Sequence, residues 1–170
     1  MIVGQAPGVV EVTTRVPFSG RAGAELRRWL GRAGIAADAL PYRTSMTKCF
    51  PGKATAGAGD RVPSAAEIAL CSPWLDAELA LLRPAVVLPV GLLAIRRFWG
   101  PGSLGTIIGR SRRAPERGDA LIIPLPHPSG ASRWLNQGSN RLLLAQALDL
   151  VAAAAQQLGD NVLELADPGA

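Results

Sequence analysis

His127 is the only histidine in this 170-residue chain, and it lies between two prolines shortly after an apolar run at residues 120–123. Imidazole titrates near neutral pH, so it can donate a proton or a hydrogen bond to a reacting group. In parallel sheets the segments that follow the strands gather at one edge, where ligands bind. His127 is therefore the first residue to consider for chemistry.

A second segment that could bind a ligand is a turn near the start of the chain. It follows the apolar residues 1–3 and consists of Gly4, Gln5, Ala6, Pro7 and Gly8. Glycine lets a ligand approach the backbone closely, and the amides of Gln5 and Ala6 can point at a ligand oxygen. Taken alone, the same turn is explained better as a tight connection between a strand and a helix without a ligand.

The elements that must position these segments alternate between strand and helix. Short runs predict strands at residues 1–3, 42–47, 85–91 and 120–125. Periodic apolar positions predict helices at residues 22–34, 65–82, 92–99 and 140–158. Ser64 and Glu67 have the spacing of a capping box, and Gly34 should end the first helix. The alternation predicts an α/β fold, a three-layer α/β/α sandwich with a central four-stranded parallel sheet.

Length and composition fit one domain. The chain has 48% hydrophobic residues, and we place the domain at residues 1–158, followed by a weakly ordered acidic tail at 159–170. No apolar run reaches the ~20 residues that a membrane-spanning helix needs. Two cysteines do not suggest a secreted disulfide scaffold. We therefore expect a cytoplasmic monomer with no membrane partner.

The charge of the chain points to a polyanionic partner. The formal net charge is +5, and residues 159–170 contribute three acidic and no basic residues, so the remainder carries 18 basic and 10 acidic residues, or +8. Such an excess favours nucleic acid. A solvated arginine-rich surface explains it equally well. Residues 110–117 include four arginines, which suit phosphate contacts, and a solvated hairpin loop explains them equally well.

Several motifs occur in one order along the chain. They are the turn at residues 4–8, Glu11, Pro17-Phe18-Ser19-Gly20, Thr44-Ser45, Cys49, Cys71 and His127-Pro128-Ser129. In order and spacing these motifs resemble the uracil-DNA glycosylase superfamily, most closely its iron-sulfur families four and five. The resemblance covers nearly the whole chain.

The resemblance implies that uracil is flipped out of DNA and leaves as an anion while the sugar becomes an oxocarbenium ion. His127 would donate a hydrogen bond to uracil O2, and the amides near Gln5 and Ala6 would add donors to the same pocket. Phe18 would stack on the flipped base. The other substrate-binding residues implied are Gly4, Pro7, Gly8 and Ser45. A core role for Phe18 and a purely local role for His127 are the alternatives.

Three positions depart from the family pattern. Ala6 stands where the best-known branch has an aspartate that acts on water, and Gln5 replaces the family-four glutamate. A water would then be placed by Gln5 with backbone groups or by Glu11, which matches an acidic family position but also fits a solvated loop. Ser45 replaces an asparagine that reads the uracil edge, so another group reads the base or the specificity extends to other deaminated bases.

The resemblance also implies a four-iron, four-sulfur cluster held by four cysteines. Cys49 and Cys71 match two of these ligands, and the family's other two precede the first strand. This sequence begins at that strand, so we expect that its start lies further upstream or that the chain is a fragment. For the chain as it stands, two buried thiols without metal are the alternative.

The loop after His127 is the segment predicted to touch DNA. The equivalent family loop enters the minor groove, which implies DNA contacts by Ser129, Gly130, Ser132 and Arg133. Arg133 is the preferred wedge or phosphate contact. Trp134 and Leu135 either extend this loop or return to the core.

These features predict a monofunctional uracil-DNA glycosylase that acts on uracil-containing DNA and starts base excision repair. No lysine is placed for Schiff-base chemistry. One alternative is a damaged-DNA binding module of the same fold with weak catalysis, suggested by Ala6, Ser45 and the missing cysteines. Another is a hydrolase with Ser129 as its nucleophile, although the chain has no second histidine to activate it.

Overall fold

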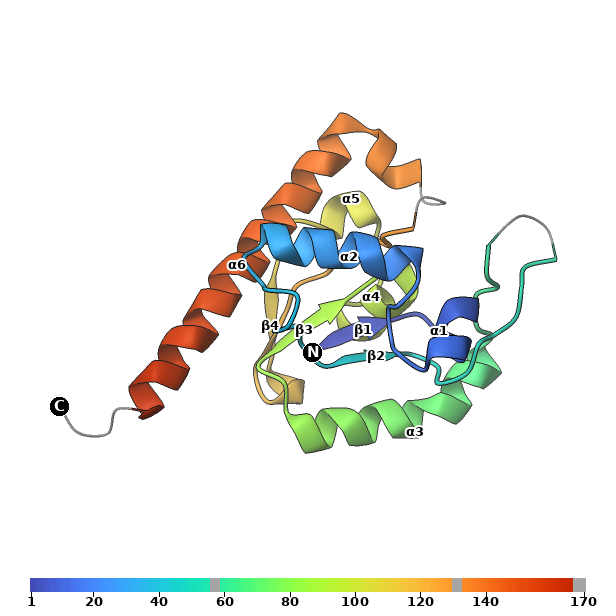
Figure 1. Cartoon of the computed structure of the whole chain (residues 1–170), viewed down its shortest axis with the longest axis horizontal. Coiled ribbons are helices and arrows are strands. Elements are labelled where there is room, and N and C mark those ends of the chain that lie inside the picture. Colours follow the sequence, from blue (N-terminus) through green and yellow to red (C-terminus); the bar gives the residue numbers. More distant parts are fainter. Residues whose placement is uncertain (56–58, 130–132, 167–170) are drawn as a thin grey trace.

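The computed structural model describes residues 1–55, 59–129 and 133–166. Its centre is a five-stranded sheet with the order β2-β1-β3-β5-β4 (Figure 1). The strands are β1 (Ile2–Gly4), β2 (Arg43–Ser45), β3 (Val86–Pro89), β4 (Arg112–Ala114) and β5 (Ala120–Ile122). Four of them run parallel, and β4 is antiparallel to β5. This arrangement confirms the predicted α/β class and its parallel core.

Helices cover both faces of this sheet (Figure 1). The described helices are α1 (Val9–Thr14), α2 (Arg21–Arg32), α3 (Ala65–Leu82), α4 (Leu92–Phe98), α5 (Leu104–Ile107) and α6 (Gly138–Ala166). There are also two 3₁₀ turns. η1 (Pro115–Arg117) follows β4, and η2 (Arg133–Asn136) precedes α6.

The core has two layers because successive side chains of a strand point to opposite faces of the sheet. Ile2 belongs to one cluster with Trp29 of α2 and Leu148 of α6. Val3, the next residue of β1, belongs to a second cluster with Leu75 of α3. Burial on both faces explains why the central strands are apolar throughout. The two layers agree with the predicted α/β/α sandwich.

Two helix ends lie at or close to the positions that the sequence predicts. At the start of α3, the Ser64 hydroxyl accepts the Glu67 N–H at 3.3 Å, and the Glu67 carboxylate accepts the Ser64 N–H at 2.7 Å. After α2, Gly34 has a φ of +81°, and the N–H of Ile35 donates to the carbonyl of Leu30 at 3.0 Å. The second pattern is a Schellman motif, which glycine favours because it adopts positive φ without strain.

The sheet has one strand more than predicted, because residues 112–114 form β4 within a segment expected to be a loop. Three residues are too few to give an alternating pattern. Arg112 of this strand donates to the Phe98 carbonyl at 2.8 Å, and its guanidinium lies 5.5 Å from the centre of the Trp99 ring. Arg112 therefore holds the sheet edge to α4. The short helices α1 and α5 were likewise not predicted.

The last helix is longer than predicted. α6 continues to Ala166, so it includes residues 159–166 of the segment predicted to be a weakly ordered acidic tail. The stretch Gly138–Asp160 is long and apolar enough to cross a membrane by length and composition alone. This is weak evidence, since core helices pass the same test, and α6 buries Leu144 and Leu148 in the core. The absence of a membrane partner stays a prediction.

Candidate active site

His127 lies in the segment after β5, beside the segment after β3. A bridge between Val90 and Leu125 holds the two segments together. Gly91 has a φ of +84°, and a Cβ at this position would lie 3.1 Å from Cδ2 of His127. Glycine therefore permits both the backbone conformation and the close approach of the ring. The half-buried imidazole is placed at the carboxyl edge of the sheet.

The protonation state of His127 follows from its contacts with Ser129. The Ser129 N–H donates to Nδ1 at 3.2 Å, and the Ser129 hydroxyl lies 2.8 Å from the same nitrogen. Since a backbone N–H can only donate, Nδ1 is an acceptor, and the proton of the neutral ring is on Nε2. Burial lowers the pKa of His127, although the nearby charge of Asp60 acts in the opposite direction. The site thus holds a neutral imidazole that carries its proton on Nε2.

The turn after β1 is fixed against the end of β2. The Gly4 carbonyl accepts the Met46 N–H at 2.9 Å, and the Gln5 carbonyl accepts the Thr47 N–H at 3.3 Å. In a trans peptide the C=O and N–H point in opposite directions. The N–H groups of Gln5 and Ala6 consequently point away from β2, toward the side on which β3 lies. The structure thus aims the two predicted backbone donors in fixed directions.

Glu11, in the first turn of α1, ties this turn to the loop that carries Phe18. Its Oε2 accepts the Gly8 N–H at 3.1 Å, and its Oε1 accepts the Gly20 N–H at 2.9 Å. Pro7, within the turn, is half-buried. Because both carboxylate oxygens hold backbone amides, the geometry indicates a positioning role for Glu11 and does not favour the water-placing role considered from the sequence.

The Phe18 ring lies directly on the end of β1. A Cβ on Gly4 would come within 2.7 Å of Cζ of Phe18, so glycine is what lets the ring approach. Phe18 has a φ of +57°, which a bulky residue rarely adopts, and its carbonyl accepts from Nη1 of Arg27 at 2.9 Å. The same carbonyl lies so close to α2 that a Cβ on Gly23 would be 1.6 Å away. Phe18 is half-buried and also packs on the core, so both roles considered for it fit.

Ser45 lies beside Gly4 in the paired strands β2 and β1. It is half-buried, and its hydroxyl donates to the Thr47 carbonyl at 2.7 Å. Together with the preceding residues, it completes a site at the carboxyl ends of neighbouring strands. The predicted residues Gly4, Gln5, Ala6, Phe18, Ser45 and His127 all come from segments that end or follow β1, β2 and β5 at this edge.

Asp60 is a candidate site residue that the sequence interpretation did not name. It lies in the segment at residues 50–61, for which the sequence predicts only a loop, and its Oδ1 accepts from Nζ of Lys53 at 2.7 Å. Its Oδ2 would lie 3.1 Å from a Cβ on Gly8, and its charge raises the pKa of His127. The sequence carries no periodic signal here, so only the folded chain brings this carboxylate to the site.

The predicted DNA-binding loop is described in part. Ser129 contacts Nδ1 of His127, and Arg133 is exposed at the start of η2. Gly130 and Ser132 lie outside the described residues. Trp134 packs against the core, which fits the alternative in which this residue returns to the core after the loop. The Ser129 N–H already uses the lone pair of Nδ1 that a general base would need, so the geometry does not favour Ser129 as a nucleophile.

Cys49 and Cys71 lie near each other in the fold. The N–H of Lys48 donates to Sγ of Cys71 at 3.4 Å. Cys49 is exposed, which corrects the expectation of two buried thiols. A four-iron, four-sulfur cluster needs four cysteines, this chain has two, and no three potential metal ligands gather among the described residues. The residues present do not by themselves fit the cluster, and no chemical step is assigned to it.

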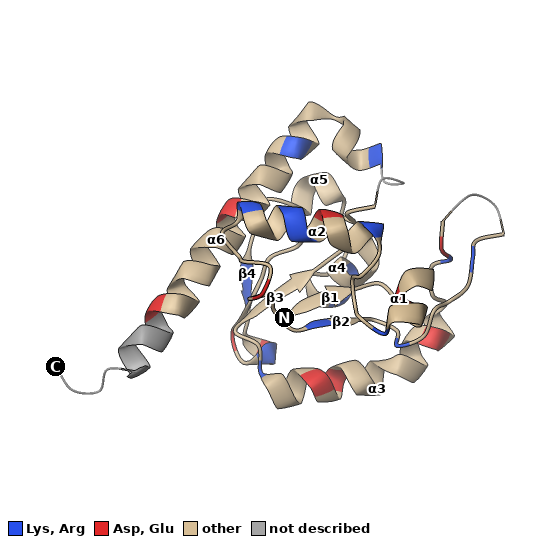
Figure 2. Ribbon diagram, viewed as in Figure 1, with Lys and Arg blue, Asp and Glu red and all other residues tan. Residues whose placement is uncertain are grey.

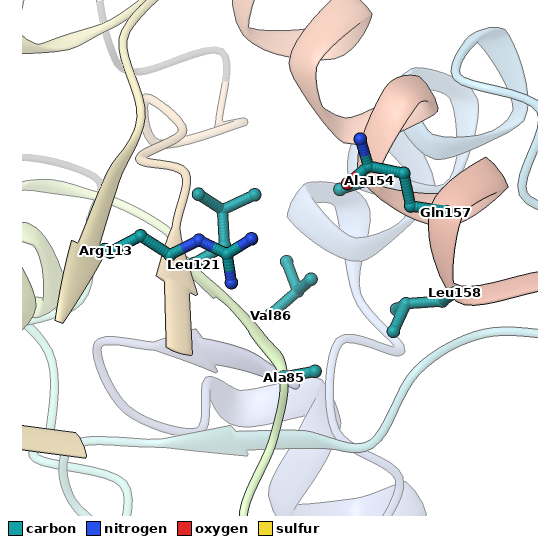
Figure 3. A pocket seen from close by; sticks show the side chains of 7 residues that line it. All are labelled: Ala85, Val86, Arg113, Leu121, Ala154, Gln157 and Leu158. Atoms are coloured by element: carbon teal, nitrogen blue, oxygen red, sulfur yellow. The ribbon is translucent and has the colours of Figure 1, made fainter. Parts of the chain in front are cut away.

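Two cavities of the described chain lie at the opposite edge of the sheet. The larger, of about 520 Å³, is lined by Met1, Ile35, Leu88 and Val151 among others. The smaller, of about 110 Å³, lies between the sheet and α6 (Figure 3) and is lined by Ala85, Val86, Arg113, Leu121, Ala154, Gln157 and Leu158. Neither is lined by a predicted site residue, so the edge with His127 stays the candidate for chemistry.

The helices on the two faces of the sheet carry opposite charge. α2 contains four arginines and one glutamate, whereas α3 contains three acidic residues and no basic residue. Figure 2 shows the basic residues in blue along α2 and the acidic residues in red on α3. A polyanion is therefore attracted to the α2 side, where the Phe18 loop enters the helix.

Comparison with known proteins agrees with this geometry. The family model described as the uracil DNA glycosylase superfamily matches residues 1–151. A type-4 uracil-DNA glycosylase of Thermotoga maritima is 29% identical over 85% of this chain and 71% of its own length. A type-4 uracil-DNA glycosylase of Pyrobaculum aerophilum is 32% identical over 70% of this chain and 53% of its own length. A type-5 uracil-DNA glycosylase of the same organism is 30% identical over 69% of this chain and 47% of its own length. Because the family model matches residues 1–151, which include all of these motifs, the chain belongs to the uracil DNA glycosylase superfamily.

Proposed function

We propose that this chain is a monofunctional DNA glycosylase that hydrolyses the N-glycosidic bond of uracil in DNA and so starts base excision repair. The observation that carries the proposal is the neutral His127, placed at the same sheet edge as Phe18 and the Gln5 and Ala6 amides. The relatives, which are named uracil-DNA glycosylases, support the same substrate.

In this reaction the flipped uracil stacks on Phe18, and its O2 accepts a hydrogen bond from Nε2 of His127. The bond between N1 and C1′ breaks, its electron pair leaves with uracil, and the sugar becomes an oxocarbenium ion. Negative charge then grows on O2, where His127 and the amides of Gln5 and Ala6 stabilise it. A donor that is already oriented by Ser129 needs no rearrangement as this charge develops.

A water completes the hydrolysis by adding to C1′ and transferring a proton to a carboxylate. Ala6 has no side chain for this task, and Glu11 is occupied by two amides. Asp60 remains, with Oδ1 held by Lys53 and Oδ2 close to Gly8. We assign the placing of the water and the acceptance of its proton to Asp60.

The two lysines of the chain support hydrolysis without a lyase step. Lys48 forms an ion pair with Glu78 at 2.9 Å, and Lys53 forms one with Asp60 at 2.7 Å. An ammonium group held in an ion pair has no free lone pair with which to attack C1′ and form a Schiff base. The expected product is therefore an intact abasic site.

The test is an excision assay on a labelled oligonucleotide with one uracil, followed by alkali to cleave abasic sites. His127→Ala should lower the excision rate by about 100-fold to 1000-fold, the usual effect of removing one such donor. Arg32→Ala, at the distant end of α2, is the matched control and should keep the parent rate.

The competing interpretation is a damaged-DNA binding module with weak catalysis. It predicts that the folded parent binds the uracil oligonucleotide in a salt-sensitive manner and yields no alkali-labile product. That result would contradict the enzyme and favour the binding module.

A further inference from the structure

α3 carries apolar side chains on its outer side as well as on its inner side. Leu75, on the inner side, is buried in the core. On the outer side Leu70, Trp74 and Leu81 are 77%, 67% and 83% exposed, and Leu81 and Leu70 are the most exposed of the large apolar side chains in the described parts of the chain. Figure 1 shows α3 as the outermost element on its side of the sheet. A helix that is apolar on both sides is usually covered on both, so the outer side of α3 is a candidate interaction surface.

The exposed apolar side chains have the spacing of a seam between two helices. Four exposed residues, which we call the α3 stripe, follow one another at intervals of four, three and four positions: Leu70, Trp74, Ala77 and Leu81. Alternating intervals of three and four keep side chains on one side of a helix, and two helices pack along their length by this pattern. At 1.5 Å per residue the stripe is about 17 Å long. Its spacing therefore favours another helix as the group that covers it.

The α3 stripe is complementary to itself in the antiparallel direction. If a two-fold axis passes between residues 75 and 76, each Leu70 faces Leu81 of the second copy, and each Trp74 faces Ala77 of the second copy. The large indole then lies over the smallest side chain of the stripe, and two leucines form an apolar layer at either end. A parallel pair would instead place Trp74 against Trp74 and Ala77 against Ala77, which crowds one layer and leaves a gap in the next. The order of side chains thus favours a second copy of α3, antiparallel to the first.

The charges of α3 do not oppose this pairing. Each of its three acidic residues forms an ion pair with a basic residue elsewhere in the same chain. The pairs are Glu67 with Arg61 at 2.7 Å, Asp76 with Arg97 at 2.6 Å and Glu78 with Lys48 at 2.9 Å. Two copies of α3 therefore meet without uncompensated like charges, and a basic partner would find these carboxylates already occupied. Pro73 and Ala80, exposed beside the stripe, add uncharged surface.

From these observations we propose that the chain forms a two-fold homodimer in which the α3 stripes of two copies pack antiparallel. A two-fold dimer uses the same surface on both copies, as a self-complementary stripe requires. One pair of helices of this length gives an interface near the low end of the usual size, about 1,200 Å², so the association is in the micromolar range. Because α2 packs on the opposite face of the sheet, the basic sides of both copies stay open to DNA. This dimer differs from the monomer expected from the sequence.

Sedimentation velocity tests the dimer over a range of protein concentrations, from about 1 µM to about 300 µM. The parent should pass from monomer to dimer and form nothing larger. Leu70→Glu and Leu81→Lys should each raise the Kd by about 10-fold or more, because each places two charges against leucines. Leu142→Glu is the matched control, since Leu142 of α6 is also 67% exposed and lies outside the stripe. It should dimerise like the parent.

A mixture of the Leu70→Glu and Leu81→Lys chains tests the antiparallel register. In a mixed dimer the two introduced charges have opposite sign and face one another at one end of the stripe, while the other end keeps its two leucines. The mixture should therefore associate more tightly than either variant alone. In a parallel dimer positions 70 and 81 never meet, so mixing would restore nothing.

Three results would overturn the proposal. They are a parent that stays monomeric over the whole range, a dimer that both substitutions leave unchanged, and a mixture that associates no better than its components. Both substituted leucines are exposed, so the variants should fold, and circular dichroism checks this. Excision of uracil does not enter these measurements, so the dimer and the proposed function stand or fall separately.

Discussion

The charge of Asp60 and the burial of the ring act in opposite directions on the titration of His127. Burial lowers the pKa of His127, the charge of Asp60 raises it, and burial has the larger effect. The ring is therefore neutral near pH 7, and Nε2 carries the proton because Nδ1 accepts from Ser129. The ability of Nε2 to donate to a ligand therefore depends on the hydrogen bond from the Ser129 N–H to Nδ1.

The first residue-scale prediction concerns the titration of His127. We expect a folded-state pKa below the ordinary 6.5, measured by NMR of the single imidazole of the chain. Because the unfolded chain then binds more protons between the two pKa values, the free energy of unfolding should fall as the pH drops below 6.5 toward the folded-state pKa. A pKa at or above the ordinary value would contradict the buried neutral ring.

Asp60→Ala provides the second residue-scale prediction. Loss of the carboxylate should lower kcat for uracil excision by about 100-fold, within the usual range for one general base. The same change should lower the pKa of His127 further, since the raising effect of Asp60 is removed. NMR titration of the variant separates this electrostatic effect from misfolding. Unchanged kcat would remove Asp60 from the mechanism.

At the scale of elements, α2 positions the aromatic platform of the site. The Phe18 carbonyl rests on Gly23 and accepts from Arg27, while Glu11 of α1 holds the amide of Gly20. Phe18 thus depends on contacts with two helices, α1 and α2. The helix registers of α1 and α2 must stay fixed for the ring to lie on Gly4.

Gly23→Ala tests this dependence. Its Cβ would lie 1.6 Å from the Phe18 carbonyl oxygen, so the loop must move. A displacement of about 1 Å in a positioning group costs about 100-fold in rate, which is the expected loss of kcat/KM. Gly31→Ala is the matched control, because its Cβ meets nothing within 4 Å in the same helix. Circular dichroism should report an intact fold for both variants, and equal activity of the two would refute the packing argument.

On the scale of the whole molecule, charge determines how DNA approaches. The net charge is +5, α2 is basic and α3 is acidic, so the field is asymmetric across the sheet. Arg133 is exposed next to the loop that carries His127 and Ser129. This arrangement orients a polyanion toward the site edge and away from α3.

Arg133→Ala should weaken binding of uracil-containing and uracil-free DNA alike, and should reduce the slope of log K against log salt by about 1. Fluorescence anisotropy over a range of salt concentrations measures both quantities. Arg32→Ala, which removes the same charge at the far end of α2, serves as control and should change the slope less. Equal slopes for the two variants would argue against a phosphate contact at Arg133.

Much of the fold could be predicted because its signals are local. The apolar runs of β1, β3 and β5, the capping box at Ser64 and the terminal Gly34 mark their elements directly. β4, α1 and α5 span only three to six residues, so no period can be recognised in them. The end of α6 was missed because an acidic composition does not by itself stop a helix.

The amino-acid sequence alone determined which chemistry is available: one imidazole, one aromatic ring beside a glycine turn, and a serine in place of an asparagine. The tertiary structure decided how these groups are used, because hydrogen-bond partners depend on packing across elements. It brought the charge of Asp60 to bear on His127, bound Glu11 to two backbone amides and bound the Ser45 hydroxyl to the Thr47 carbonyl. Such contacts join residues that no local pattern connects, so they become visible only in the folded chain.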